Sequence, residues 1–212
     1  MTNPSQPRSV KIGSDERTGW SSDRPRPEGV AARPVDVSGR CRVLKPSDRL
    51  RYSPGSLLMI VSGSPAERDA FTERLIEDRS VLLSVDKVRG LLAGRVDEEE
   101  MEERATELLD AAVGKRLDAG ETVVIPAAGL SFEERDRYIR MAHKLRRPRH
   151  LILLDVPRDQ VSEEDRNTVN DLRTALDAGA LGEEGFQTAL RLGGGSMGEV
   201  KRIVFAPPPK DD

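Results

Sequence analysis

From Ser56 onward the sequence alternates short apolar runs with longer amphipathic stretches, and this alternation constrains the fold more than any other feature. Five such runs, rich in leucine and β-branched residues, lie at residues 57–61, 81–85, 122–125, 151–156 and 203–205. Strands that are apolar throughout are typical of sheets covered on both faces, which are mostly parallel. The runs therefore predict strands of a buried parallel sheet.

The amphipathic stretches between the runs predict helices. Residues 97–119 repeat apolar side chains at spacings of three to five residues and carry acidic side chains between them. A second helix is predicted to begin at Ser131, because Ser131 and Glu134 have the spacing of a capping box. Strands that alternate with helices form right-handed βαβ units. The predicted fold class is α/β, a three-layer α/β/α sandwich with a five-stranded, mainly parallel sheet.

Composition divides the chain into three predicted parts. Residues 1–52 are rich in Pro, Ser, Arg and Asp and show almost no apolar periodicity, so we expect a disordered basic tail. Residues 53–208 are expected to form the folded domain, and residues 209–212 a disordered C-terminus. The tail is interpreted either as a solvated linker or as a contact for RNA or a protein partner.

Charge and cysteine content exclude several classes of protein. The formal net charge of -3 gives no global attraction to nucleic acid or anionic lipid. Cys41 is the single cysteine, so neither an intrachain disulfide nor a thiolate zinc site can form, and no metal site is predicted. The first residues lack the apolar segment of a signal peptide, and no run approaches the roughly 20 apolar residues of a membrane span. We expect a cytoplasmic protein with no membrane partner.

Ligands of open α/β sheets bind beyond the carboxyl ends of the strands, so the residues after each apolar run are the candidates for a site. The first run is followed by Ser62-Gly63-Ser64-Pro65, where a P-loop protein would continue with Gly-x4-Gly-Lys-Ser/Thr, and only the first glycine is in place. Ser64, Pro65 and Glu67 instead have the pattern of a helix N-cap, N1 proline and capping-box glutamate. This helix terminus is predicted to satisfy itself, with a carboxylate at the position that phosphate would take.

Four residues of this segment are nevertheless the candidates for binding a nucleotide. They are Gly63, Ser64, Arg68 and Asp69. Arg68 would supply the positive charge of the missing lysine, although its planar guanidinium does not replace a lysine ammonium in a phosphate cradle.

The strongest motif follows the second run, as Asp86-x-x-Arg89-Gly-Leu. Together with Gly-Lys-Arg-Leu-Asp-Ala-Gly at 114–120, Thr-Val-Val at 122–124 and Glu-Gly-Phe at 184–186, it makes residues 55–207 resemble the kinase domain of bacterial polynucleotide 5′-hydroxyl kinases and related P-loop phosphotransferases. The resemblance implies that Asp86 is the general base on the 5′-hydroxyl and that Arg89 helps to bind the acceptor strand. The alternative is that Asp86 caps a short helix and Arg89 is its solvated partner.

Two further segments depart from the family that the chain resembles. Its third strand runs into Asp-Ala-Thr-Asn, which serves the metal and the phosphates, but residues 126–129 here read Pro-Ala-Ala-Gly. Its lid arginines correspond to a mostly acidic segment at 160–166, in which Arg166 is the candidate lid residue. Phosphoryl transfer depends on positioning and charge stabilisation, so these losses all indicate a weakened or lost kinase activity.

Two other segments of the sequence allow two interpretations each. Residues 193–198 match Gly-x-Gly-x-x-Gly, but the predicted strand that follows fails the dinucleotide-binding context and favours a flexible loop. His143 and His150 lie in a basic stretch that is either an RNA-facing patch or a solvated helix end.

The leading hypothesis is a degenerate polynucleotide kinase-like domain, a pseudokinase that binds nucleotide, RNA or DNA 5′ ends, or a protein partner without efficient phosphoryl transfer. The alternative is an active ATP-dependent phosphotransferase that uses Mg·ATP with Arg68, Asp69 and Asp86. A third interpretation is a partner protein whose contact is made by residues 1–52.

Overall fold

The computed structural model describes residues 35–207, and the compact unit of the chain begins at Asp36. Two strands that precede residue 53, β1 (Arg42–Val43) and β2 (Arg49–Tyr52), pair with strands of this same unit. The domain boundary predicted at residue 52 is therefore corrected to Asp36. The rest of the predicted tail, residues 1–34, and the C-terminal segment from residue 208 lie outside the described residues.

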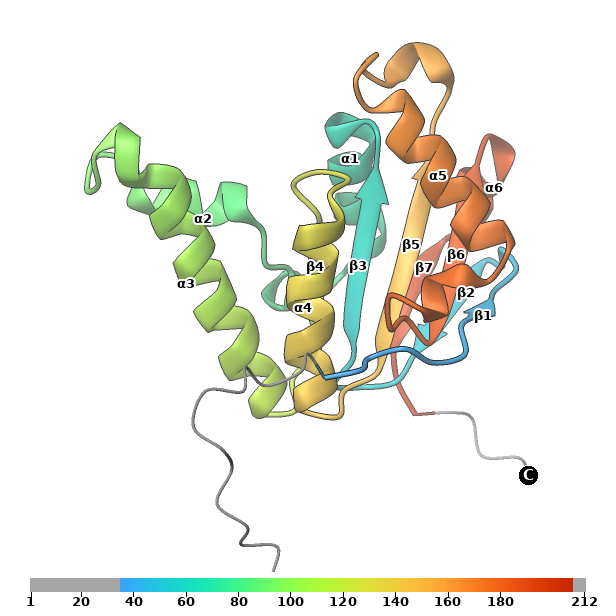
Figure 1. Ribbon diagram of the computed structural model, residues 1–212, viewed down its shortest axis with the longest axis horizontal. Helices are drawn as coiled ribbons and strands as arrows, with labels where there is room; N and C mark the ends of the chain where they lie inside the picture. The colour runs from blue at the N-terminus through green and yellow to red at the C-terminus, as the bar shows by residue number, and fades with distance from the viewer. Residues whose placement is uncertain (1–34, 208–212) are drawn as a thin grey trace, which may run out of the picture. The chain divides into compact units, whose positions relative to one another are not determined.

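The main sheet has five strands, and every pairing in it is parallel (Figure 1). Their spatial order is β1, β6 (Thr188–Gly193), β5 (Arg149–Asp155), β3 (Leu57–Ser62) and β4 (Val123–Pro126). The predicted α/β class with a five-stranded sheet is confirmed. Leu57 is paired with Arg149 on one side and with Val123 on the other, so β3, β4 and β5 run in register toward one carboxyl edge.

Helices and a second small sheet cover the two faces of the main sheet. One face packs against α3 (Glu98–Asp118), α4 (Phe132–Lys144) and α5 (Arg166–Asp177). The other face packs against α1 (Pro65–Leu75) and the parallel pair of β2 with β7 (Arg202–Phe205). Within β3, Met59 belongs to the first core and Ile60 to the second, which explains why this run is apolar at every position.

Shorter elements connect these layers. Helix α2 (Val85–Leu92) packs against α3, and α6 (Gly195–Glu199) precedes β7. Three 3-10 turns lie at Arg79–Val81, Arg158–Gln160 and Ala180–Gly182. Among residues 35–207, no helix is both long enough and apolar enough to cross a bilayer.

The predicted strand at 81–85 is wrong. Asp78 caps a 3-10 turn by accepting from the Ser80 N–H, and Ser84 caps α2. Both ends of the apolar run are therefore helical. Only Leu82 remains to form an isolated bridge with Val124. Local capping therefore decides the conformation here against the β-branched composition.

The apolar run at 203–205 is a strand, but it belongs to the small sheet with β2 and not to the main sheet. Its place is taken by β6, whose burial is interrupted at Arg191, so that it lacks a continuous apolar run. The Gly-rich segment predicted as a flexible loop contains the short helix α6. The helix predicted at 97–119 and the helix start at Ser131 are confirmed by α3 and α4.

Candidate functional site

The turn between β3 and α1 passes directly into the helix, as its sequence predicts. Ser64 is the N-cap, its Oγ accepts from the Glu67 N–H at 3.5 Å, and Pro65 occupies the first helical position. The Ser64 N–H donates to the Ser62 Oγ at 3.1 Å. The Glu67 side chain is exposed and forms no return bond to Ser64, so only one half of the capping box exists. The predicted N-cap is confirmed, and the N–H groups of Ser64 and Glu67 are each bonded to a serine hydroxyl of the chain.

Apolar side chains occupy the space beside Gly63. A Cβ added to this glycine would lie 2.9 Å from a methyl group of Val161 and 3.1 Å from one of Val169, both closer than ordinary contact. Val161 and Val169 are buried, and they come from the segment between β5 and the first turns of α5. In a phosphate loop the backbone around the first glycine wraps the ligand's phosphates. Here the space next to that backbone is filled by the chain.

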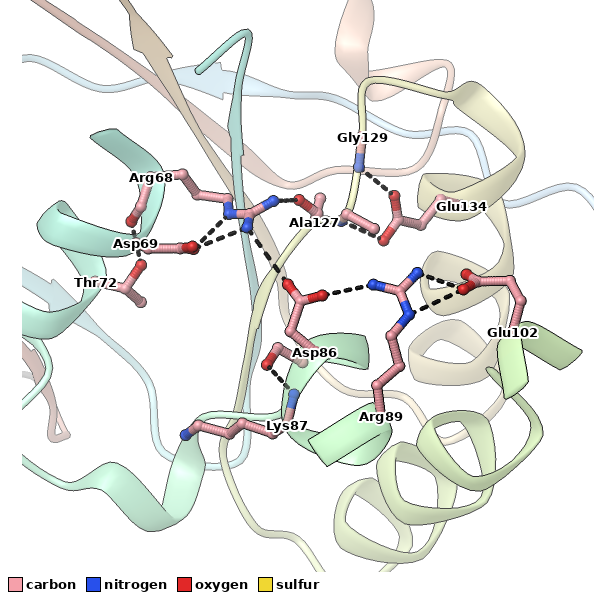
Figure 2. A network of polar contacts seen from close by, with 12 residues as sticks. Arg68, Asp69, Thr72, Asp86, Lys87, Arg89, Glu102, Ala127, Gly129 and Glu134 are labelled. Carbon is pink, nitrogen blue, oxygen red and sulfur yellow. Dashed lines mark hydrogen bonds and ion pairs between the residues drawn. The ribbon is translucent and has the colours of Figure 1, made fainter. Parts of the chain in front are cut away.

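Arg68 of α1 is a buried cation at the centre of a polar network (Figure 2). Its side chain is 4% exposed. Its Nη1 donates to the carbonyl oxygen of Ala127, its Nε donates to Asp69 Oδ1 at 2.8 Å, and its Nη2 lies 3.9 Å from Asp86 Oδ2. The guanidinium thus joins α1 to the carboxyl end of β4 and to α2. Its donors are directed at groups of the protein itself.

The network continues from Asp86 to Arg89 and Glu102. Ser84 is the N-cap of α2, so Asp86 lies in the first turn of the helix and does not cap it. Arg89 Nη1 donates to Asp86 Oδ1 at 2.5 Å, and Arg89 Nε donates to Glu102 Oε2 at 2.9 Å. The hydrogen bond to Glu102, followed by that to Asp86, raises the pKa of Arg89. Arg89 therefore links α2 to α3, and Figure 2 shows its guanidinium between the carboxylates of Asp86 and Glu102.

A pair of backbone amides at the end of β4 binds a carboxylate of the chain. The N–H groups of Ala128 and Gly129 donate to Glu134 Oε1 and Oε2 at 2.9 and 3.2 Å (Figure 2). Successive N–H groups that converge in this way form a binding site for anions. Glu134 was predicted to close a capping box with Ser131. Its own N–H does donate to Ser131 Oγ at 3.1 Å, but its carboxylate occupies the amide pair instead.

The predicted lid residue Arg166 lies apart from this network. It begins α5, and its Nη1 is 3.8 Å from Glu163 Oε1. Within residues 35–207 its buried Nε has no hydrogen-bond partner, and no contact joins it to Arg68 or Asp86. The structure therefore brings Arg68, Asp69, Asp86 and Arg89 together but leaves Arg166 outside the cluster.

Two other arginines near the carboxyl edge are paired with carboxylates, since both contact Asp155 and Arg191 also contacts Asp177. Asp155 ends β5, and it accepts from Arg173 Nε and from Arg191 Nε, each at 2.7 Å. Neither guanidinium is left without a counter-charge.

The residues present do not fit Mg·ATP as the P-loop chemistry requires. A triphosphate needs free N–H groups around the glycine, an accessible cation and polar side chains on the metal side. The space beside Gly63 is filled, Arg68 is bound to the protein, and Glu134 occupies the amides that follow β4. The part of the chain that the structure describes holds no group of three or more side chains placed to bind a metal ion.

Sequence reasoning missed three residues that define this arrangement. Val161 and Val169 carry no sequence signal for contact with Gly63, because the contact depends on how α5 packs across the sheet edge. Glu134 could have been found, since a small-residue turn shortly before an acidic helix start offers amides to that carboxylate.

A family model described as "AAA domain" matches residues 69–181, which is more than half of the chain. The match begins after the turn that holds Gly63 and Ser64. No curated protein matches the chain.

Among solved structures, a kinase-like protein from Chloroflexus aurantiacus is 15% identical over 66% of this chain and 86% of its own, with a TM-score of 0.44. An APS kinase from Mycobacterium tuberculosis is 16% identical over 67% and 90%, with a TM-score of 0.39. A gluconokinase from Sinorhizobium meliloti is 15% identical over 67% and 84%, with a TM-score of 0.34. These scores are too low to carry an argument about function. On the family match, the chain belongs to the AAA domain family.

Proposed function

We propose that this domain is a degenerate P-loop kinase-like binding module that does not carry out efficient phosphoryl transfer. The observation that supports it most is the packing of Val161 and Val169 against Gly63. Phosphoryl transfer is catalysed almost entirely by positioning and by charge stabilisation. These two buried side chains fill the side of Gly63 on which a Cβ would lie, so the turn is packed tightly against the start of α5 and offers little room to position a triphosphate.

Electrostatics supports the same proposal. The carboxylates of Asp69, Asp86 and Glu134 occupy the partners that a phosphate would need. A phosphate charge about 4 Å from one carboxylate would meet roughly 4 kcal/mol of repulsion at an effective dielectric of about 20. That amounts to about three decades of affinity. The carboxylates of the chain thus supply the negative charge that the phosphates of a bound nucleotide supply in a kinase.

The test is transfer of labelled phosphate from ATP to an oligonucleotide with a 5′-hydroxyl, measured with the purified full chain. Kinases turn over at about 1–100 per second. We expect no transfer above background, and no difference between the wild-type chain and Asp86→Ala. Transfer at ordinary kinase rates that Asp86→Ala abolishes would overturn the proposal.

One observation favours an active ATP-dependent phosphotransferase of the polynucleotide 5′-hydroxyl kinase type as the second candidate. Arg68, Asp69 and Asp86 lie side by side, and Asp69 and Asp86 border a cavity of about 190 Å³. In that case Asp86→Asn should remove the activity. Glu73→Gln, which changes another carboxylate at the same cavity, should leave it intact and serves as the matched control.

A further inference from the structure

A strongly basic pocket lies at the amino edge of the sheet, away from the site described above. Because α4 runs back from the carboxyl edge, its last turn lies beside the start of β5 (Figure 1). The pocket, of about 510 Å³, is lined by His143, Lys144, Arg146, Arg147, Arg149 and Gln187. We call these six residues the basic pocket. No carboxylate is among them.

Two of its guanidinium groups are fixed in place without being neutralised. Arg147 Nε donates to the carbonyl oxygen of Leu117 at 2.7 Å, and Arg149 Nε donates to that of Gly185 at 2.7 Å. Carbonyl oxygens orient a guanidinium but leave its full positive charge. Lys144 and Arg146 are exposed. Within residues 35–207 none of these four cations forms an ion pair, in contrast to the paired arginines at the carboxyl edge.

The backbone gives a second, independent observation at Arg146. It has a φ of 56°, and it is the one non-glycine residue with a positive φ among those the structure describes. Its N–H donates to the His143 carbonyl and the Arg147 N–H to the Ala142 carbonyl, the pair of bonds that closes a helix around a left-handed residue.

The equivalent left-handed positions after α3 and α5 are occupied by Gly120 and Gly179. A cation is favourable near any helix C-terminus, but α3 and α5 use glycine at this position. Arg146 thus places a cation at a backbone position that glycine occupies at the ends of α3 and α5, and it is one of the residues that line the basic pocket.

We propose that the basic pocket binds a ligand that carries two or more phosphate groups. Guanidinium forks match phosphate oxygens in geometry and charge, and three guanidinium groups and one lysine ammonium line this one pocket. No Phe, Tyr or Trp side chain lines the pocket, so the large rings on which bases usually stack are absent from it. Recognition therefore rests on the phosphates, whether these come from a single-stranded nucleic acid backbone or from an inorganic polyphosphate. This inference is independent of the function proposed for the carboxyl edge.

The experiment measures the anisotropy of a labelled single-stranded DNA oligonucleotide with the full chain, and in parallel titrates inorganic tripolyphosphate calorimetrically. The test variant is Lys144→Gln/Arg146→Gly. Arg146→Gly suits the left-handed backbone, so this variant should unfold at an unchanged or higher temperature. The matched control is Lys45→Gln/Arg95→Gln, which removes two exposed charges outside the basic pocket.

Each single-strand phosphate contact contributes about 0.7 decade of affinity between 1 M and 0.1 M salt, so two lost contacts should weaken binding about 25-fold at 0.1 M. The slope of log affinity against log salt concentration, which is negative, should become less steep by about 1.4 in the test variant. The control should change neither value.

Saturable binding of the oligonucleotide, weakened selectively by the test variant and displaced by tripolyphosphate, supports the proposal with nucleic acid as the source. Binding of tripolyphosphate alone, with the same selective loss, supports it with a small polyphosphate as the source. Failure of both probes to bind, or equal losses in test and control variants, overturns it.

Discussion

Arg68→Met tests whether the buried guanidinium holds the site together or is kept for a ligand. The change should destabilise the domain by about 2 kcal/mol. The largest contribution to this loss of stability comes from the carbonyl of Ala127, which is buried and loses its hydrogen-bond partner at a cost of about 1–3 kcal/mol. Asp69 and Asp86 are 54% and 59% exposed, so they regain water and their lost ion pairs add at most about 1 kcal/mol. Methionine preserves most of the packing of the aliphatic stem.

The free energy of unfolding is best measured by urea titration followed by far-ultraviolet circular dichroism, because the single tryptophan, Trp20, lies outside the described residues. A loss of 2 kcal/mol corresponds to a fall of about 4–8 °C in Tm for a domain of this size. The matched control is Arg104→Met on α3, whose ion pairs with Glu100 and Glu107 are exposed. It should change stability by less than about 0.5 kcal/mol.

A stability of Arg68→Met equal to or above that of the wild-type chain would refute this reasoning. It would mean that burying the guanidinium costs more than its contacts return. That is the behaviour expected of a residue retained for a phosphate ligand, as in the second candidate function.

Three other substitutions test separate parts of the account. Gly63→Ala should cost about 1–3 kcal/mol through overpacking and should be partly rescued by Val161→Ala, whereas Gly114→Ala, which meets no atom within 4 Å, should be neutral or stabilising in thermal melts. Burial lowers the pKa of His150 from 6.5 to about 4, so the unfolded state binds a proton at a higher pH than the folded state does. As the pH falls from 6.5 to 4, the free energy of unfolding should therefore decrease by up to about 3 kcal/mol because of this residue. In urea titrations, His150→Gln should lack this part of the decrease. Arg146→Gly should raise the free energy of unfolding by about 1 kcal/mol, and a decrease would show that the left-handed backbone is not strained there.

The sequence predicts well what depends on local pattern. The continuous burial of β3 and the N-caps at Ser64 and Ser131 depend on residues that are neighbours in the sequence, and each of these predictions is confirmed. The run at 81–85 shows the limit, because a cap at Ser84 competes with an apolar composition and prevails. β6 was missed because Arg191 interrupts its apolar pattern, although Asp155 satisfies that arginine in the fold.

The candidate site was predictable in part. The broken phosphate loop is visible around Gly63, and Arg68 does lie near Asp86, although Asp86 belongs to the first turn of α2 and does not follow a strand as predicted. The residues that fill the site are long-range partners. Val161 reaches Gly63 across the sheet, and Glu134 leaves its predicted capping role for amides of the preceding turn. Neither contact has a sequence spacing that marks it.

Calorimetric titration of the full-length protein with Mg·ATP tests whether the turn after β3 is already filled by the chain. We expect no saturable heat at nucleotide concentrations up to about 1 mM, since a single repelling carboxylate already removes about three decades of affinity. Saturable binding in the micromolar range that Arg68→Ala abolishes while leaving the protein folded would contradict it.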